Sequence, residues 1–186
     1  MKILRRTFFG NPILRQTARQ LAPQDIKSEE VQSLIADMRY TLERRQYGVG
    51  LAAPQVGKSL ALSVISIRPT PNRPELEPVS LVIINPRIVQ TYGRRSGLWE
   101  GCMSFGNGLH LPYAQALRYS RIRVSYMDEN AKHHEKDFDG ILGHVIQHEI
   151  DHLNGVLFVD HVKDTTTYTT IGEFRKRHPV KKRTDS

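Results

Sequence analysis

Several features are scarce in this 186-residue sequence, and each absence excludes a class of protein. There is one cysteine, Cys102, so no internal disulfide can form and a reducing, cytoplasmic compartment is expected. No apolar run exceeds four residues, as at positions 81–84. A membrane-spanning helix needs about 20 apolar residues and a secretory signal about 7–15, so neither is expected.

The charge of the chain is concentrated at its two ends. Of the net charge of +8, residues 1–25 hold five Lys or Arg against one acid, and residues 171–186 hold six against two. Hydrophobic residues make up 39% of the chain, which is typical of one globular domain. We therefore expect a domain over residues 1–170 and a basic C-terminal tail over residues 171–186. The tail suggests contact with an anionic partner such as a ribosome, although no motif of sequence-specific nucleic-acid binding is present.

Hydrophobic periodicity predicts two strong helices with strands between them. Apolar residues recur at helical spacing over residues 28–47 and again over residues 140–154, where Asp139 suits the N-cap and Gly155 the position after the C-cap. A weaker helix is predicted over residues 167–177. Short alternating or β-branched segments predict strands at residues 61–67, 81–84, 87–92 and 121–126. This order indicates an α+β fold, with the second helix central and packed against small, mostly antiparallel sheets, and the first helix structural.

The central helix carries the pattern His-Glu-x-x-His at residues 148–152. Residues four apart share one face of a helix, so His148 and His152 can bind one metal ion. Glu149 can lie beside that ion and accept a proton from a metal-activated water. His144 shares the face but lies about 12 Å from His152 along the axis, at ~1.5 Å per residue, and is expected to line the pocket instead.

The third protein ligand is left open by spacing alone, although a catalytic site normally has three. A third histidine six residues after His152 would indicate a metzincin-like enzyme, but that position is Phe158. A downstream carboxylate, Glu173, and the thiol of Cys102 remain as candidates. Gly101 would let the backbone at Cys102 approach an ion closely.

Three motifs together resemble the peptide deformylase family. They are Gly-Val-Gly-Leu-Ala-Ala-Pro-Gln at residues 48–55, Glu-Gly-Cys-Met-Ser at residues 100–104 and Gln-His-Glu-Ile-Asp-His at residues 147–152. Their order and approximate spacing are those of the family, and the likeness extends over residues 9–165. The resemblance implies a catalytic domain that removes the N-formyl group from the formylmethionine of newly synthesised proteins.

The same resemblance implies a role for each site residue. Cys102, His148 and His152 would bind one divalent metal ion, Fe²⁺ in the cell, with Zn²⁺, Ni²⁺ or Co²⁺ able to replace it. Glu149 would be the general base, while the Gln55 side chain and the Met103 backbone N–H would stabilise the oxyanion. Substrate would contact the residues that line the cleft: Val49, Gly50, Leu51, Glu100, Gly101, His144 and Val145.

The chain departs from the family pattern at several positions. Met103 stands where leucine is usual, and the proline usually found shortly after the middle motif is missing from residues 105–108. Tyr113 follows Pro112 where the family has arginine, which leaves the charge partner of Glu100 unassigned. His144 occupies a commonly aliphatic position, so the methionine pocket is expected to be more polar.

Two other functions are compatible with parts of the pattern. Another His-Glu-x-x-His metal hydrolase, such as a peptidase, would not depend on Cys102. A non-catalytic, ribosome-associated protein would not depend on Glu149 or Gln55.

Overall fold

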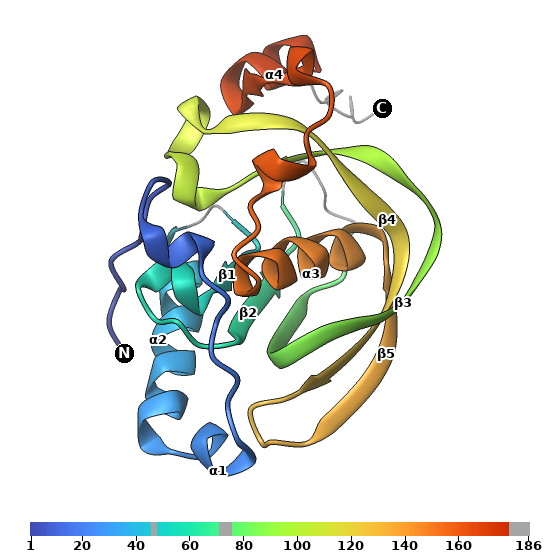
Figure 1. The fold of residues 1–186 in the computed structure, drawn as a ribbon. Helices are drawn as coiled ribbons and strands as arrows, with labels where there is room; N and C mark the ends of the chain where they lie inside the picture. The colour runs from blue at the N-terminus through green and yellow to red at the C-terminus, as the bar shows by residue number, and fades with distance from the viewer. Residues whose placement is uncertain (46–47, 71–75, 179–186) are drawn as a thin grey trace, which may run out of the picture.

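The computed structural model describes residues 1–45, 48–70 and 76–178, and its elements confirm the α+β class (Figure 1). The helices are α1 (Pro23–Ile26), α2 (Glu29–Arg45), α3 (Gly140–Leu153) and α4 (Ile171–Arg177). The strands are β1 (Gly50–Ala52), β2 (Leu62–Ile67), β3 (Val79–Gly101), β4 (Pro112–Met127), β5 (His133–Asp139) and β6 (Thr169–Thr170).

The strands form one antiparallel sheet in the order β1-β2-β3-β4-β5, with β6 paired to β4. The predicted strands at residues 81–84 and 87–92 are both parts of the long β3. Register shifts between Ile84 and Arg87, and again near Ile88 and Tyr92, interrupt the β3–β4 ladder. Such irregularities bend and twist a strand, and the β3–β4 hairpin curls strongly (Figure 1).

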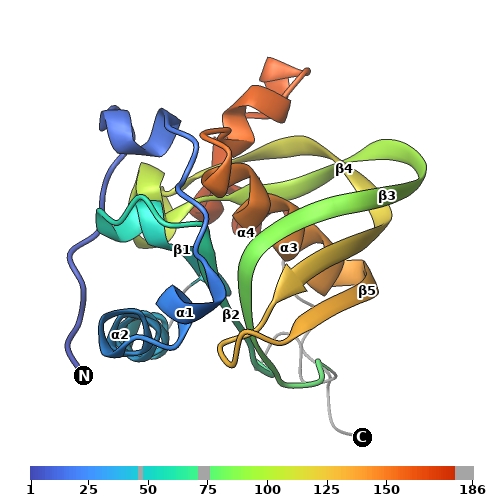
Figure 2. The same ribbon diagram turned by 60° about the horizontal axis from the view of Figure 1, so that its bottom comes forward.

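The sheet curves around α3, which both ribbon views place inside its concave side (Figures 1 and 2). Where β2 meets the start of β3, alternate side chains face different helices. Val64 and Val82 belong to a core cluster with α2, whereas Ile65 and Ile83 belong to a cluster with α3. A strand buried on both faces is apolar at successive positions, and this accounts for the unbroken run at residues 81–84.

The predicted ends of the two strong helices agree with the structure where it describes them, whereas the weaker helix begins only at Ile171, because Thr169–Thr170 pair with β4 as β6. The Ser28 Oγ accepts a hydrogen bond from the Val31 amide at 3.3 Å, which is an N-cap contact at the start of α2. Tyr47, the predicted end of that helix, lies outside the described residues. Gly155 follows the C-cap of α3 with a φ of 70°, a left-handed conformation that favours glycine.

The C-terminal segment packs on the end of the β3–β4 hairpin. The ring of Phe174 on α4 lies 4.7 Å from that of Trp99 and 5.0 Å from that of Tyr113, measured between centroids. The first part of the predicted tail is therefore an ordered helix, and residues 179–186 lie outside the described residues. Within the described part of the chain, no helix combines the length and apolarity required to cross a membrane.

Candidate metal centre

Three of the predicted ligands converge at one point. Cys102 follows the end of β3, and His148 and His152 lie one turn apart on α3. One ligand atom from each lies within 4.8 Å of the other two, and the Cys102 Sγ is 3.2 Å from the His152 Nε2. The alternative third ligand, Glu173, lies on α4, where it is exposed and forms an ion pair with Lys176 at 2.6 Å.

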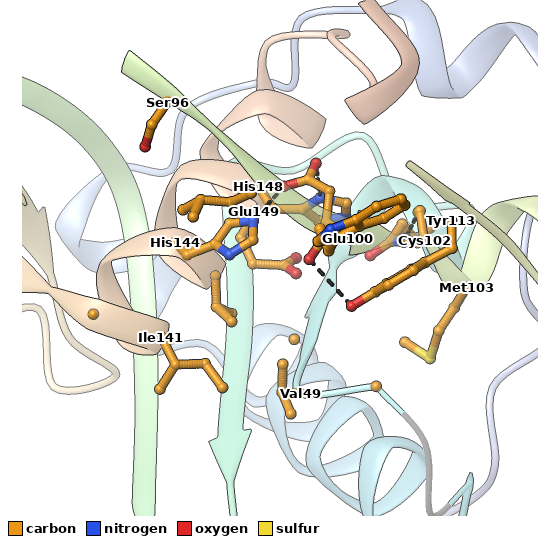
Figure 3. A pocket seen from close by; sticks show the side chains of 18 of the residues that line it. Val49, Ser96, Glu100, Cys102, Met103, Tyr113, Ile141, His144, His148 and Glu149 are labelled. Atoms are coloured by element: carbon orange, nitrogen blue, oxygen red, sulfur yellow. Dashed lines mark hydrogen bonds and ion pairs between the residues drawn. The ribbon is translucent and has the colours of Figure 1, made fainter. Parts of the chain in front are cut away.

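Glu100 orients one of these imidazoles. Its Oε1 lies 3.2 Å from the His148 Nδ1, which leaves the His148 Nε2 for an ion. A carboxylate that bonds the outer nitrogen of a ligating histidine fixes the ring and increases its basicity. The other carboxylate oxygen contacts the Nε2 of His144, so two histidines of α3 share this buried side chain (Figure 3).

The charge partner of Glu100 is Arg118, five residues beyond the position at which arginine was expected. The Arg118 Nη2 is 2.7 Å from one Glu100 oxygen and its Nε is 3.0 Å from the other. Burial alone would raise the pKa of Glu100, but the hydrogen bonds from His144 and His148, and then from Arg118, hold it well below its ordinary value. Tyr113 instead donates its hydroxyl to the Trp99 carbonyl at 3.2 Å. The Glu100 carboxylate is thus fully paired.

The buried ion pair extends away from the candidate metal ligands. The Arg118 Nη1 also contacts Asp151, whose Oδ2 lies 3.0 Å from the His161 Nε2. The side chain of Arg118 is only 3% exposed, so both carboxylates compensate its charge in a region of low dielectric.

The electrostatics favour a cation between the thiol and the imidazoles. Burial would raise the pKa of Cys102, yet the charge of His152 and hydrogen bonds from both imidazoles lower it well below its ordinary value. Burial likewise opposes a charge on His148, but hydrogen bonds with Cys102 and Glu100 raise its pKa. The thiolate is the form that binds metals, and the negative potential of Cys102 and Glu100 also attracts a divalent ion. The donor set and its surroundings therefore fit a metal ion.

Glu149 lies next to this cluster in a buried position. It is 2% exposed, and its Oε2 has no hydrogen-bond partner among the described residues. Burial raises the pKa of this carboxyl group to about 7. A Cβ at Gly50 would lie 2.2 Å from the Glu149 Oε1, so only glycine lets β1 approach the carboxylate this closely.

Gln55 points its amide at the same sulfur. Its Oε1 accepts a hydrogen bond from the Ala52 amide at 2.8 Å, which directs the Nε2 inward. The Nε2 lies 3.4 Å from the Cys102 Sγ and 3.2 Å from the Ser104 Oγ. Met103 follows Cys102 in the chain, and its side chain packs against Gly48 so closely that a Cβ at Gly48 would lie 2.5 Å from the Met103 sulfur.

A cavity of about 550 Å³ opens beside these groups (Figure 3). Its walls include all the predicted substrate-contacting residues except Leu51. Because alternate residues of a strand face opposite ways, the Leu51 side chain is fully buried in the core with α2. Sequence reasoning missed several lining residues, among them Ser96, Leu98, Trp99, Tyr113 and Ile141. Leu98 and Ser96 could have been predicted, because alternate residues of a strand share the face of Glu100. Ile141 could also have been predicted, because it lies three residues before His144 on the same face of the helix.

The fold and this site define the class of metal-dependent hydrolases, with one thiol and two imidazoles placed where they could hold the ion. The family model described as "Polypeptide deformylase" matches residues 4–168. A curated peptide deformylase from Leptospira biflexa is 39% identical over 163 residues, covering 86% of this chain and 87% of the relative. The chain belongs to the peptide deformylase family.

Solved structures agree with this assignment. A class I type b peptide deformylase from Acinetobacter baumannii bound to Met-Ala-Ser has a TM-score of 0.78 at 30% identity, covering 86% of this chain and 98% of that one. The peptide deformylase of Synechococcus elongatus in complex with actinonin has a TM-score of 0.74 at 38% identity, covering 94% and 85%. The comparisons support the expectation of a metal-dependent peptide deformylase and do not support the peptidase or non-catalytic alternatives.

Proposed function

We propose that this protein removes the formyl group from N-terminal formylmethionine of nascent peptides and releases formate, using one divalent metal ion. The convergence of the Cys102 thiol with the imidazoles of His148 and His152 carries this proposal. Thiolate and imidazole donors suit Fe²⁺, the ion we propose for the cell, and also Zn²⁺, Ni²⁺ and Co²⁺. A metal ion in such a site lowers the pKa of a water molecule and polarises a carbonyl group.

Glu149 has the environment of a general base. Its carboxylate is buried beside the ligands with one oxygen unpaired within the described structure, and its raised pKa lies near neutral pH. A base with a pKa near the working pH can both accept and return a proton. We assign it the removal of a proton from the attacking water and the delivery of that proton to the leaving amine.

Gln55 and the Met103 N–H are assigned to the oxyanion of the tetrahedral intermediate. The Gln55 Nε2 is held by the Ala52 contact at its other end, so its direction is set before substrate arrives. Donors that are already oriented stabilise the developing charge without a cost of reorganisation.

The cavity offers a place for the peptide. β1 forms one edge of the sheet, and Val49 and Gly50 line the cavity beside it. An extended peptide can pair with such an edge through its backbone. The methionine side chain is assigned to the wall formed by α3, which includes Ile141, His144 and Val145.

The basic C-terminal segment is proposed to contact the ribosome. Arg175, Lys176 and Arg177 follow one another at the end of α4, and further basic residues continue to Arg183 in the sequence. Phosphate contacts weaken steeply with salt. Association with ribosomes that does not change between 50 and 300 mM salt would contradict this electrostatic role.

The decisive experiment measures formate release from a formyl-methionyl peptide after anaerobic purification, together with metal content. We expect Glu149→Gln to keep its metal and lose activity by at least about 100-fold, and Cys102→Ala to lose both metal and activity. Glu135→Gln, on the exposed face of β5, is the matched control and should behave as the wild type. Activity that survives in Cys102→Ala would favour a different metal hydrolase.

A further inference from the structure

We propose that residues 6–9, here called the N-terminal bracket, position the two oxyanion donors relative to each other, with Arg6 as the principal positioning residue. This inference rests on the proposed function, because it concerns the donors assigned above. It concerns the hydrogen bonds that link the start of the chain to the loops of Gln55 and Met103.

The bracket is anchored outside the site. The Lys2 amide donates to the Asp37 Oδ1 at 2.7 Å, and the Leu4 amide donates to the Thr41 Oγ1 at 2.8 Å. Both acceptors are buried side chains of α2. The segment that leads into the bracket is therefore fixed on a long helix.

The bracket joins the two donor loops through its backbone. The Thr7 amide donates to the Gln55 carbonyl at 2.8 Å, and the Phe9 amide donates to the Ser104 carbonyl at 2.7 Å. The Phe9 ring also stacks on Phe105 with a centroid distance of 4.4 Å. Two residues of one short segment thus set the spacing of two loops that are about fifty positions apart in the sequence.

Arg6 adds a side-chain contact that reaches Met103 itself. Its guanidinium Nη1 donates to the Met103 carbonyl at 2.8 Å, and the residue is only 7% exposed. The same guanidinium contacts the Asn107 side chain further along the loop. A buried guanidinium that bonds a backbone carbonyl and a second loop residue fixes position more tightly than a single donor.

The Arg6 contact acts on a peptide group that also touches the metal ligand. The carbonyl of the Met103–Ser104 peptide accepts from Arg6, while its N–H lies 3.4 Å from the Cys102 Sγ. The plane of this peptide is held at both ends. The Met103 N–H belongs to the preceding Cys102–Met103 peptide, which is joined to this one at the Met103 Cα. Fixing the plane of the Met103–Ser104 peptide therefore restricts the direction in which the Met103 N–H points.

The loop that follows Cys102 needs contacts from other segments to fix its conformation, because its own sequence allows many backbone conformations. It contains Gly106 and Gly108, and it lacks the stiffening of the proline that was expected there. Glycines leave the backbone many accessible conformations, so the direction of the Met103 N–H depends on contacts from elsewhere. Arg6 and Phe9 provide contacts of this kind.

The test compares Arg6→Met, Arg6→Lys and the control Arg5→Met, whose wild-type side chain is exposed on the neighbouring position. Metal content, kcat and KM for a formyl-methionyl peptide, and hydrogen exchange of the amides of residues 103–107 are measured on each metal-loaded variant. For Arg6→Met we expect a kcat at least about 10-fold lower, a KM within about twofold of wild type, unchanged metal content and faster exchange. Arg6→Lys keeps one donor and should recover part of kcat, while Arg5→Met should match wild type.

The outcomes separate this inference from the proposed function. A wild-type protein that releases no formate refutes the proposed function, and the exchange rates then still report whether Arg6 holds the loop. An Arg6→Met variant with wild-type kcat, or with a raised KM and unchanged kcat, overturns the positioning role. Should Arg6→Met fail to fold, wild-type kcat in Arg6→Lys together with wild-type exchange in residues 103–107 overturns it, and a reduced kcat with faster exchange supports it.

Discussion

Arg118 shows at the scale of single residues how this site holds a buried charge. Its guanidinium lies between Glu100 and Asp151, and the first of these orients the proposed ligand His148. Removing one member of a buried ion network leaves the other charges without compensation, and this costs more than the pair contributes to stability.

We predict that Arg118→Met lowers the free energy of unfolding by about 3–5 kcal/mol, because Glu100 and Asp151 lose their shared partner. Urea denaturation at neutral pH measures the loss. Arg121→Met is the matched control, since the Arg121–Asp137 pair lies on the exposed surface, where ion pairs contribute little. A loss for Arg118→Met no greater than that of the control would contradict this account.

The second prediction concerns His144, whose imidazole lines the cavity and contacts Glu100. His144→Ile removes a polar group from the wall assigned to the first side chain of the substrate. We expect the preference for formyl-methionine over formyl-glutamine peptides, as the ratio of kcat/KM values, to rise by about threefold to tenfold. Metal content is measured alongside. An unchanged ratio of kcat/KM values in a variant fully loaded with metal would contradict this prediction.

The residues of the site also show how much of it could be predicted from the sequence. His148, Glu149 and His152 follow from helical spacing, because that relation is local. Cys102 was one of two open candidates on spacing alone, since its approach depends on how β3 ends against α3. Arg118 was missed because the family pattern placed the arginine at position 113, whereas the folded loop and the β3–β4 register decide which side chain reaches Glu100.

At the scale of elements, helix positions were more predictable than strand lengths. Periodicity and caps located α2 and α3 within a few residues where the structure describes them. The strands at 81–84 and 87–92 merge into β3 because Asn85, with a φ of 50°, bends the strand without ending it. Its side chain bonds both backbone groups of Leu21, a contact 64 positions away that local sequence does not reveal.

A third prediction concerns the two 3₁₀ segments Pro12–Arg15 and Phe158–His161, which the Arg15–Asp160 ion pair joins. Burial would raise the pKa of Asp160, but hydrogen bonds from Arg15 and the Leu157 amide outweigh it and lower the pKa. A carboxylate with a lowered folded-state pKa stabilises the fold above its unfolded pKa, about 3.9, and loses this effect as pH falls through the folded value.

Asp160→Asn should therefore be less stable than wild type at pH 7, and the difference should shrink as the pH falls below about 4. Urea midpoints at pH 7, 5 and 3.5 measure it. Glu135→Gln serves as the control, because that carboxylate is exposed on β5 and lies outside the two joined segments. A difference that is constant across this range would refute the linkage.

For the whole molecule, the proposed metal centre would join β3 to α3 and should contribute to global stability. An ion that binds only the folded state stabilises it by mass action, by about 2.7 kcal/mol at a concentration 100 times the Kd. We predict that chelation lowers the Tm by about 5–10 °C, and that restoring Fe²⁺ or Zn²⁺ anaerobically reverses the change. Cys102→Ala should have a low Tm that neither treatment alters. A Tm independent of metal in the wild type would contradict the proposed ion.

The lone indole of the sequence, Trp99, lies in the wall of the cavity and stacks with Tyr113 at a centroid distance of 5.6 Å, while Phe174 contacts it from α4. Emission excited selectively at the indole must therefore come from this one place. Peptide titrations and detachment of the terminal helix can therefore be followed optically without any label, each through the quenching or wavelength change of a single fluorophore.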